Sequence, residues 1–227
     1  YVPSQYFATT PLGMGLVLQG DGDFGNNVAV IANNVTFKNV DINSTSESSV
    51  LMVWFLGCTS DTRCGNNASV SVTEFTTNNV TVYASAGSVL GVFFSLGSGG
   101  NDATVMLSDI VILNSMVGGP NTCILCIMFG YFSQGNNAKV SEKNVEFNYV
   151  ATVGSGSSLL SVQFQCVACG VRPLLSLENV SVREGSVQGL LSGFLLFWFI
   201  ERGSGQESQI SVDGLTVVNS GATPSNV

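Results

Sequence analysis

The sequence has no histidine and few charged side chains. Only 10% of its 227 residues are charged, against roughly 25% in an ordinary globular domain. The seven Lys and Arg residues are scattered, so there is no basic patch for phosphate and nucleic acid is not expected as a partner. The missing histidine removes the side chain that most often serves in acid–base catalysis and metal binding.

Long hydrophobic runs are absent as well. The most apolar stretch, "GLLSGFLLFWFI" at residues 189–200, has 12 residues, whereas a membrane-spanning helix needs about 20. We interpret it as a strand buried on both faces and expect no membrane span in this segment. The chain has no initiator methionine and its first residues do not resemble a signal peptide, which is typical of a mature or excised segment.

What the sequence does contain is a repeat. A Gly-Asn-Asn or Gly-Asn-Asp motif opens four units, at Gly25, Gly65, Gly100 and Gly135. Glycine recurs in the same register every 35 residues, with five extra residues in the first interval, within "CTSDTRC" at residues 58–64. The glycines that mark the units are Gly25, Gly65, Gly100, Gly135, Gly170 and Gly205. Glycine at every marker predicts a corner that needs a positive φ or a close backbone approach.

Apolar residues keep step with these markers in columns six units deep. The four clearest columns are Val30, Val70, Val105, Val140, Leu175 and Ile210; Val35, Phe75, Ile110, Val145, Val180 and Leu215; Val17, Met52, Val92, Ile127, Val162 and Phe197; and Gln19, Trp54, Phe94, Phe129, Phe164 and Phe199. Apolar and polar positions alternate within each unit, which is the period of a strand, and no segment shows a convincing helical period.

These columns predict an all-β fold of stacked coils. A 35-residue unit cannot bury its own apolar face, but stacked units can. We therefore expect a right-handed parallel β-helix (β-solenoid) with 35-residue coils, about six and a half coils over residues 1–227. It would be a single segment, part of a longer chain or of a stacked filament. Asn26, Asn66, Asn101 and Asn136 are expected to form a ladder along one corner.

The last strand of each coil is apolar on both faces, which is typical of a strand buried on both. We expect this face to pack against a neighbouring solenoid, another part of the chain or a partner; the alternative is a flattened coil that buries both faces itself. The predicted assembly face comprises Leu18, Val53, Phe93, Met128 and Trp198, with Leu51 and Leu196 beside them. No capping repeat is visible, so the terminal coils are predicted to be open strand edges.

The six cysteines fall in three local pairs. Cys58 and Cys64 bracket the insertion and are predicted to staple its loop with a disulfide, and Cys166 and Cys169 to close the same corner in a later coil. Cys123 and Cys126 stand at a strand start, where positions i and i+3 face opposite ways, so their pairing is left open. Disulfides in a secreted protein are favoured over zinc, because the two Cys-x-x-Cys pairs lie on different sides of the coil.

Five Asn-x-Ser/Thr sequons are present, about the number that chance gives, so their positions carry the information. Asn34 and Asn179 share a column on the polar side of a strand, and Asn43 and Asn79 lie where coils turn outwards. These four are the predicted N-glycan sites if a eukaryote secretes the protein. Asn67 is a fifth candidate, in conflict with the proposed asparagine ladder. Apart from N-linked glycans, no cofactor is expected.

Parallel β-helices often cleave acidic polysaccharides, and such chemistry needs clustered carboxylates. Glu74 and Asp109 share a column on adjacent coils and form the best acidic pair, but no basic residue joins them. Asp21 and Asp23 in "GDGDFG" lack the repeated pattern of calcium-binding rolls. We therefore predict no catalytic residues and no metal site.

Glu142 is the one anomaly among the apolar columns. The other positions of its column are Ala32, Val72, Leu107, Leu177 and Val212. A carboxylate is costly to bury unless it is paired. We expect Glu142 to point outwards at a local bulge, or to pair with Lys139 or Lys143.

The stretches "NNVTFKNVDI", "TNNVTVYASAGSVLGVFFSLG" and "LENVSVREGSVQGLL" resemble the long repetitive surface proteins of kinetoplastid protists, of the dispersed gene family type. The resemblance covers the whole chain at the level of pattern. It implies a large, glycosylated β-helix, secreted or on the cell surface, with an adhesive or structural role, and it brings no catalytic residues with it.

The expected function is therefore that of a non-enzymatic structural protein, extracellular or at the cell surface. We expect a fibre or surface-coat building block that self-associates end to end or laterally. The alternative is an adhesin whose outer loops bind glycans or a host surface. A polysaccharide lyase or hydrolase is the third hypothesis.

Overall fold

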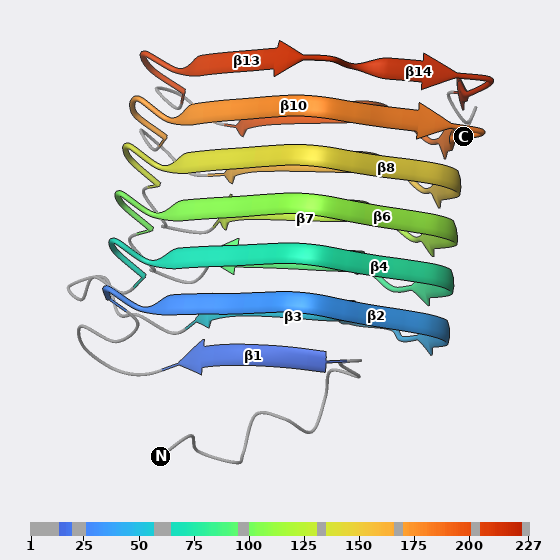
Figure 1. The fold of residues 1–227 in the computed structure, drawn as a ribbon, viewed down its shortest axis with the longest axis horizontal. Helices are drawn as coiled ribbons and strands as arrows, with labels where there is room; N and C mark the ends of the chain where they lie inside the picture. The colour runs from blue at the N-terminus through green and yellow to red at the C-terminus, as the bar shows by residue number, and fades with distance from the viewer. Residues whose placement is uncertain are drawn as a thin grey trace.

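The computed structural model describes residues 14–19, 26–56, 65–94, 100–130, 135–165, 170–200 and 205–223, with the side chains of 14–19, 56 and 200 left out. All regular secondary structure in these ranges is β-strand, and the strands pair in parallel. They form an all-β parallel β-solenoid of about four regular turns, in which like strands lie above one another as in Figure 1.

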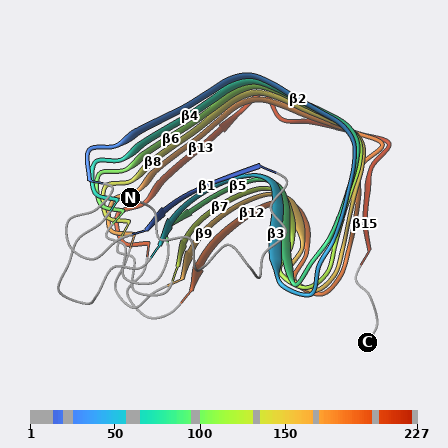
Figure 2. The same cartoon turned by 90° about the horizontal axis from the view of Figure 1, so that it is seen from below.

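The strands belong to two sheets, which face each other across the core in the view along the stack (Figure 2). The long sheet has the main order β13-β10-β8-β6-β4-β2, and the short sheet has the order β1-β3-β5-β7-β9-β12. The long sheet contains β2 (Ala29–Asn43), β4 (Ser69–Tyr83), β6 (Thr104–Gly118), β8 (Lys139–Val153), β10 (Leu174–Arg183), β11 (Ser186–Gln188), β13 (Gln209–Asp213), β14 (Thr216–Val218) and β15 (Gly221–Thr223). The short sheet contains β1 (Met14–Gln19), β3 (Glu47–Leu56), β5 (Ala86–Phe94), β7 (Cys123–Gly130), β9 (Ser158–Gln165) and β12 (Gly193–Ile200).

The register of the long sheet confirms the predicted repeat. Val30 lies opposite Val70, and Val70 opposite Val105, and the column continues through Val140, Leu175 and Ile210. The offset between paired residues is 40 for the first pair of strands and 35 afterwards. The inward residues of β4, β6 and β8 are buried because each coil covers the next.

In the short sheet the first two coils depart from the predicted register by one residue. Met52 lies opposite Gly91 and Trp54 opposite Phe93, so Val53, not Met52, joins the column of Val92. The physical cause is the turn between the sheets. Asn43 pairs with Tyr83 but Glu47 pairs with Ala86, so one of the five extra residues lies in this turn and not in the loop at residues 58–64. A shift of one residue turns every following side chain to the opposite face of the sheet.

A ladder of phenylalanine rings runs through the core beneath the short sheet. Neighbouring rings are stacked at centroid separations of 4.6 to 5.0 Å and are nearly parallel, with interplanar angles of 2 to 4°. The members are Phe55, Phe94, Phe129, Phe164 and Phe199, so Phe55 takes the place predicted for Trp54. The separation equals the distance between adjacent strands, so one aromatic ring per coil fills the layer.

The marker glycines are explained by this ladder. Gly65, Gly100, Gly135, Gly170 and Gly205 all have a positive φ, between 55 and 73°. A Cβ at Gly135 would lie 2.9 Å from atoms of both Phe129 and Phe164. The corner therefore needs glycine for its backbone conformation and for its contact with the rings, as the sequence predicted.

The long strands bend at two positions where the backbone is left-handed. At the first bend φ lies between 53 and 56°, and the residues are Asn34, Glu74, Asp109, Asn144 and Asn179. At the second bend the residues are Asn39, Asn79, Asn114, Tyr149, Glu184 and Asn219. Asparagine and aspartate tolerate this conformation better than other residues with a side chain. The two bends together contain seven of the 20 asparagines of the chain.

The predicted asparagine ladder is present. Its hydrogen bonds run from backbone N–H groups to side-chain oxygens, and not from one side-chain amide to the next. The Asn101 backbone N–H donates to Asn66 Oδ1 at 3.0 Å, and the Asn136 N–H donates to Asn101 Oδ1 at 2.9 Å. The ladder begins at Asn26, whose Oδ1 accepts from the Asn66 N–H, and its last acceptor serves the N–H of Val171. At this corner, each asparagine side chain therefore accepts a hydrogen bond from a backbone N–H of the next coil.

Replacing Asn136 with alanine tests this ladder. The Val171 N–H, which donates to Asn136 Oδ1 at 2.9 Å, would lose its acceptor, and we expect the free energy of unfolding to fall by about 1–2 kcal/mol. Urea denaturation followed by circular dichroism measures the change. The control is Ser141→Ala on the exposed face of β8, which should leave the midpoint unchanged. An equal midpoint for both variants would contradict a stabilising role for the ladder.

Candidate functional site

The most unusual side chain of the described part is Glu142 on β8. It is 1% exposed, and neither of its carboxyl oxygens has a hydrogen-bond partner. Its neighbours along the column are Leu107 and Leu177. The side chain therefore points into the core, and the expectation of an outward bulge or a lysine partner was wrong. The regular alternation of β8 is kept through this residue, so its direction is imposed by the strand.

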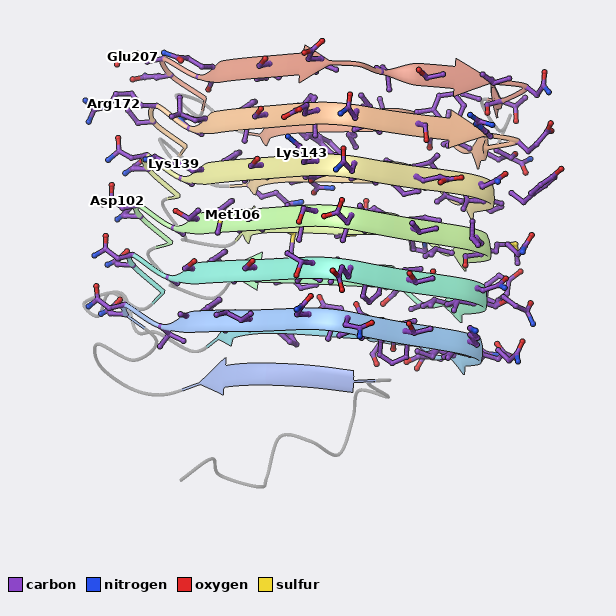
Figure 3. The ribbon with its side chains drawn as sticks, viewed as in Figure 1. Asp102, Met106, Lys139, Lys143, Arg172 and Glu207 are labelled. Atoms are coloured by element: carbon purple, nitrogen blue, oxygen red, sulfur yellow. A yellow bond between two sulfur atoms is a disulfide. The ribbon has the colours of Figure 1, made fainter. Side chains whose placement is uncertain are left out.

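Burial raises the pKa of Glu142 from 4.5 to about 8, because the apolar surroundings disfavour the charged form. Of the two proposed partners, Lys143 instead forms an ion pair with Glu178 on β10, at 2.9 Å between Nζ and Oε1. This bond raises the pKa of Lys143. In Figure 3, Lys143 lies on the outer face of β8 and Lys139 nearer the corner. At neutral pH Glu142 is accordingly a neutral acid in an apolar layer.

The predicted carboxylate pair lies at the first bend of the long sheet. Glu74 and Asp109 occupy equivalent positions on β4 and β6, both exposed and both at a positive φ. Asp109 Oδ1 accepts a hydrogen bond from Asn144 Nδ2 at 2.9 Å, so this carboxylate takes part in a ladder. An open groove of about 480 Å³ passes over this bend, lined in part by Asp109, Glu146 and Asn179.

All five sequon asparagines are on the surface, on the long sheet or the corner that precedes it. Asn34, Asn79 and Asn179 have a positive φ. The Nδ2 groups of Asn79 and Asn179 donate to the asparagine of the preceding coil, at 2.9 and 3.2 Å. Asn67 also has a positive φ and is exposed, whereas the ladder member beside it is Asn66. Asn43 ends β2, and its side chain is exposed.

Of the three cysteine pairs, Cys123–Cys126 is described, and it forms a disulfide with 5.6 Å between the two Cα atoms. The expectation that positions i and i+3 face opposite ways fails here because the start of β7 does not alternate between a buried and an exposed face. Cys123, Ile124, Leu125 and Cys126 are all buried, although the register with β5 is kept. Cys58, Cys64, Cys166 and Cys169 lie outside the described residues, as do Asp21 and Asp23.

The outer face of the short sheet contains Trp54, Phe93, Met128 and Trp198, all half-buried, with Gln163 between the last two. Of the predicted assembly face, Phe93, Met128, Trp198 and Leu196 lie on this side. Leu51 and Val53 do not: they are 4% and 2% exposed and belong to the core, because of the register shift. Leu18 pairs with Phe55 and shares its column, but its side chain is not described.

This outer face is already largely covered within the chain. Cys126 is 6% exposed and Gln163 is 7% exposed. A groove of about 300 Å³ remains, lined by Phe93, Met128 and Trp198 together with the amides of Gln163 and Gln165. The alternative of a coil that buries both faces itself therefore accounts for part of the apolar pattern.

A further open apolar surface among the described residues is at the β13 end of the stack. Ile210, Val212, Leu215 and Val217 continue the inward columns of the long sheet, yet each is 43 to 46% exposed. At the opposite end, the inward residues of β2 are only partly buried; they are Val30, Ala32, Val35, Phe37 and Val40. The sequence predicted open strand edges at the terminal coils but did not identify these residues as a site. The available signal was their place in the last unit of the apolar columns.

Within the described ranges of the chain no group of three or more Cys, Asp and Glu side chains is arranged to hold a metal ion. The same ranges contain no helix with the length and apolar character that crossing a bilayer requires.

Comparisons with protein-family models, with curated proteins and with solved structures find no match to this chain. The class of this protein is given by its fold alone. It is a parallel β-solenoid whose long sheet ends, in the described residues, in an exposed apolar edge.

Proposed function

We propose that this chain is a structural building block that self-associates through the ends of its solenoid and has no catalytic role. The observation that supports this proposal is the exposed end of the core columns. Apolar side chains at Ile210, Val212, Leu215 and Val217 stand on and between β13 and β14, which pair with β10 on one side. Their outer edge has no partner strand in the described part of the chain, and its backbone N–H and C=O groups can add another strand. Stacking on this edge would bury the apolar side chains and continue the backbone ladder.

The finer features of the proposal rest on the sequence pattern. We infer a right-handed solenoid of about six and a half coils in a segment of a longer chain or a stacked filament. We also infer an extracellular or cell-surface location, with the kinetoplastid-type repetitive surface proteins as the related class. N-linked glycans at the exposed asparagines Asn34, Asn43, Asn79 and Asn179, and at Asn67, fit this location, as does the disulfide Cys123–Cys126.

Electron microscopy and sedimentation of the chain, without detergent or denaturant, test the proposal. We expect particles that lengthen with protein concentration and an axial spacing of about 4.8 Å. Val212→Arg should abolish this growth, because it places a charge in the inward column of the open edge. The control is Val218→Arg: Val212 and Val218 are both 43% exposed, but Val218 belongs to an outward column and its replacement should have little effect. Short rods that never lengthen would contradict self-association.

A second candidate function is glycan binding by the groove on the short sheet. Aromatic rings pack on the apolar faces of sugars, and the amides of Gln163 and Gln165 can bond to hydroxyl groups. Binding to an array of neutral glycans that is lost in Trp198→Ala would favour an adhesin over a fibre.

A further inference from the structure

At each end of the described solenoid, one sheet extends one coil beyond the other; we call this offset a step, and the steps at the two ends are complementary. Among the described residues, the long sheet extends at one end to β13 and β14, one coil beyond the last strand of the short sheet, β12. At the other end the first described strand of the short sheet, β1, lies one coil before the first described strand of the long sheet, β2. Figure 1 shows both steps, with β1 below β2 and with β13 and β14 in the outermost layer. A single displacement along the stack axis would therefore fill both steps at once.

We propose that a second copy of this chain docks on the β13 end in unbroken register, with Ala29 of the incoming copy opposite Gln209. This inference rests on the self-association proposed above and specifies its geometry. The register is the one that β10 and β13 already show, in which Leu174 lies opposite Gln209. The β1 strand of the incoming copy would then lie beside β12 and complete the half-coil there.

In this register the exposed core columns become continuous. The pairs across the junction are Ile210 with Val30, Val212 with Ala32, Leu215 with Val35, and Val217 with Phe37. Each pair joins a side chain that is 43 to 46% exposed to one that is only partly buried. The hydrophobic gain comes from removing both from water, as it does between coils within the chain.

Polar side chains give the junction a direction. Wherever an asparagine amide of the long sheet bonds to the next coil, the donor lies on the coil nearer β13 and the acceptor on the coil nearer β2. Asn219 Nδ2, for instance, donates to Glu184 Oε1 at 2.9 Å. The β13 end therefore has unused acceptors and the β2 end has unused amide donors.

The residues that would meet across the junction fit this rule. On the β13 end the acceptors are Glu207, Asp213 and Asn219, and the residues of the incoming copy that face them are Asn27, Asn33 and Asn39. All six are exposed in the single chain. Figure 3 labels Glu207 at the outermost corner, in the column that also contains Asp102 and Arg172.

Stacking with opposite polarity is disfavoured for the same reason. Two β13 ends placed against each other would bring together two surfaces that both present the acceptors Glu207 and Asp213, without the asparagine amides of a β2 end. Such a junction would lack the matched donors and would place like charges on both of its sides. Head-to-tail addition is therefore the arrangement that satisfies the side chains, and it produces a polar filament.

A charge-exchange experiment tests the pairing of Asn33 with Asp213. Asn33→Asp places a carboxylate opposite Asp213 and should weaken association at least about tenfold in sedimentation velocity over a concentration series. Inside the chain the new side chain can still accept the hydrogen bond from Thr73 Oγ1, now 2.8 Å long, so the fold should be unchanged. Adding Asp213→Asn should restore association. Ser141→Asp, in the middle of β8, controls for the added charge.

The outcomes separate this inference from the function on which it rests. Weakening by Asn33→Asp that is rescued by Asp213→Asn, with Ser141→Asp unchanged, supports the register. Association that responds equally to all three variants, or to none, overturns the register but not self-association. A wild-type chain that stays monomeric at every concentration up to its solubility overturns both, and a further segment of the same polypeptide would then be the occupant of the edge.

Discussion

Replacing Glu142 with leucine should raise the free energy of unfolding by about 3 kcal/mol at pH 7. The estimate follows from a pKa raised from 4.5 to about 8 by burial, at about 1.4 kcal/mol for each unit of difference between folded and unfolded chains. Leucine matches the neighbouring positions of the column, Leu107 and Leu177, and needs no hydrogen-bond partner. Urea denaturation of both proteins across a pH series measures the difference.

The pH dependence has a definite sign. Between pH 4.5 and about 8 the unfolded chain has lost the Glu142 proton while the folded chain keeps it, so stability falls as pH rises, by about 1.4 kcal/mol per unit. Below pH 4.5 both states are protonated, and above about 8 both are ionised, so the contribution is constant there. In the leucine variant this slope should disappear, and the gap to the wild type should widen from pH 5 to pH 8.

Glu142→Gln is the matched control, because glutamine has the same shape but does not titrate. It should lose the pH slope yet stabilise less than leucine, since its buried amide still lacks a partner. Parallel pH profiles for the wild type and the leucine variant would show that Glu142 does not retain its proton in the folded chain.

Replacing Gly154 with alanine should destabilise the solenoid by about 3 kcal/mol or more. The residue has a φ of 147°, and a Cβ there would lie 1.9 Å from the carbonyl oxygen of Gly119 on the coil beneath. That atom belongs to the backbone and is fixed by the spacing of the coils, so it cannot move aside as a flexible side chain can. The shift in the urea midpoint, followed by circular dichroism, measures the loss.

The same substitution at Gly221 provides the control. A Cβ at Gly221 would meet nothing within 4 Å, so Gly221→Ala should change the stability by less than about 0.5 kcal/mol. If Gly154→Ala were as stable as Gly221→Ala, the close approach between the turns of adjacent coils would be disproved.

The repeat could be predicted from the sequence because it depends only on the spacing of residues along the chain. A 35-residue period with alternating apolar residues fits few folds other than stacked coils, so the column of Val70, Val105 and Val140 could be identified without coordinates. The marker glycines and the Asn66–Asn101–Asn136 ladder followed from the same alignment.

The first short strands could not be predicted in the same way. The five extra residues had to be placed somewhere, and the sequence did not show that one of them lies in the turn after Asn43. This single residue exchanges the inner and outer faces of β3, which moved Val53 into the core and Trp54 to the outer face.

The direction of Glu142 also depended on the fold. Because a carboxylate is costly to bury, its chemistry predicts that a glutamate avoids an apolar column. In the solenoid the pairing of β8 with both β6 and β10 fixes the register on two sides, and the strand cannot bulge without breaking both ladders. Glu142 therefore stays in the core, at the cost of two carboxyl oxygens without hydrogen-bond partners.

The sequence by itself thus determined the period, the all-β solenoid class and the corner residues, because each depends on local conformation and on repetition along the chain. The tertiary structure alone decided which face each short strand buries, the inward direction of Glu142, and the complementary steps and ladder polarity at the two ends. These features depend on where coils lie relative to one another, and a one-residue change in a turn alters them without changing the repeat.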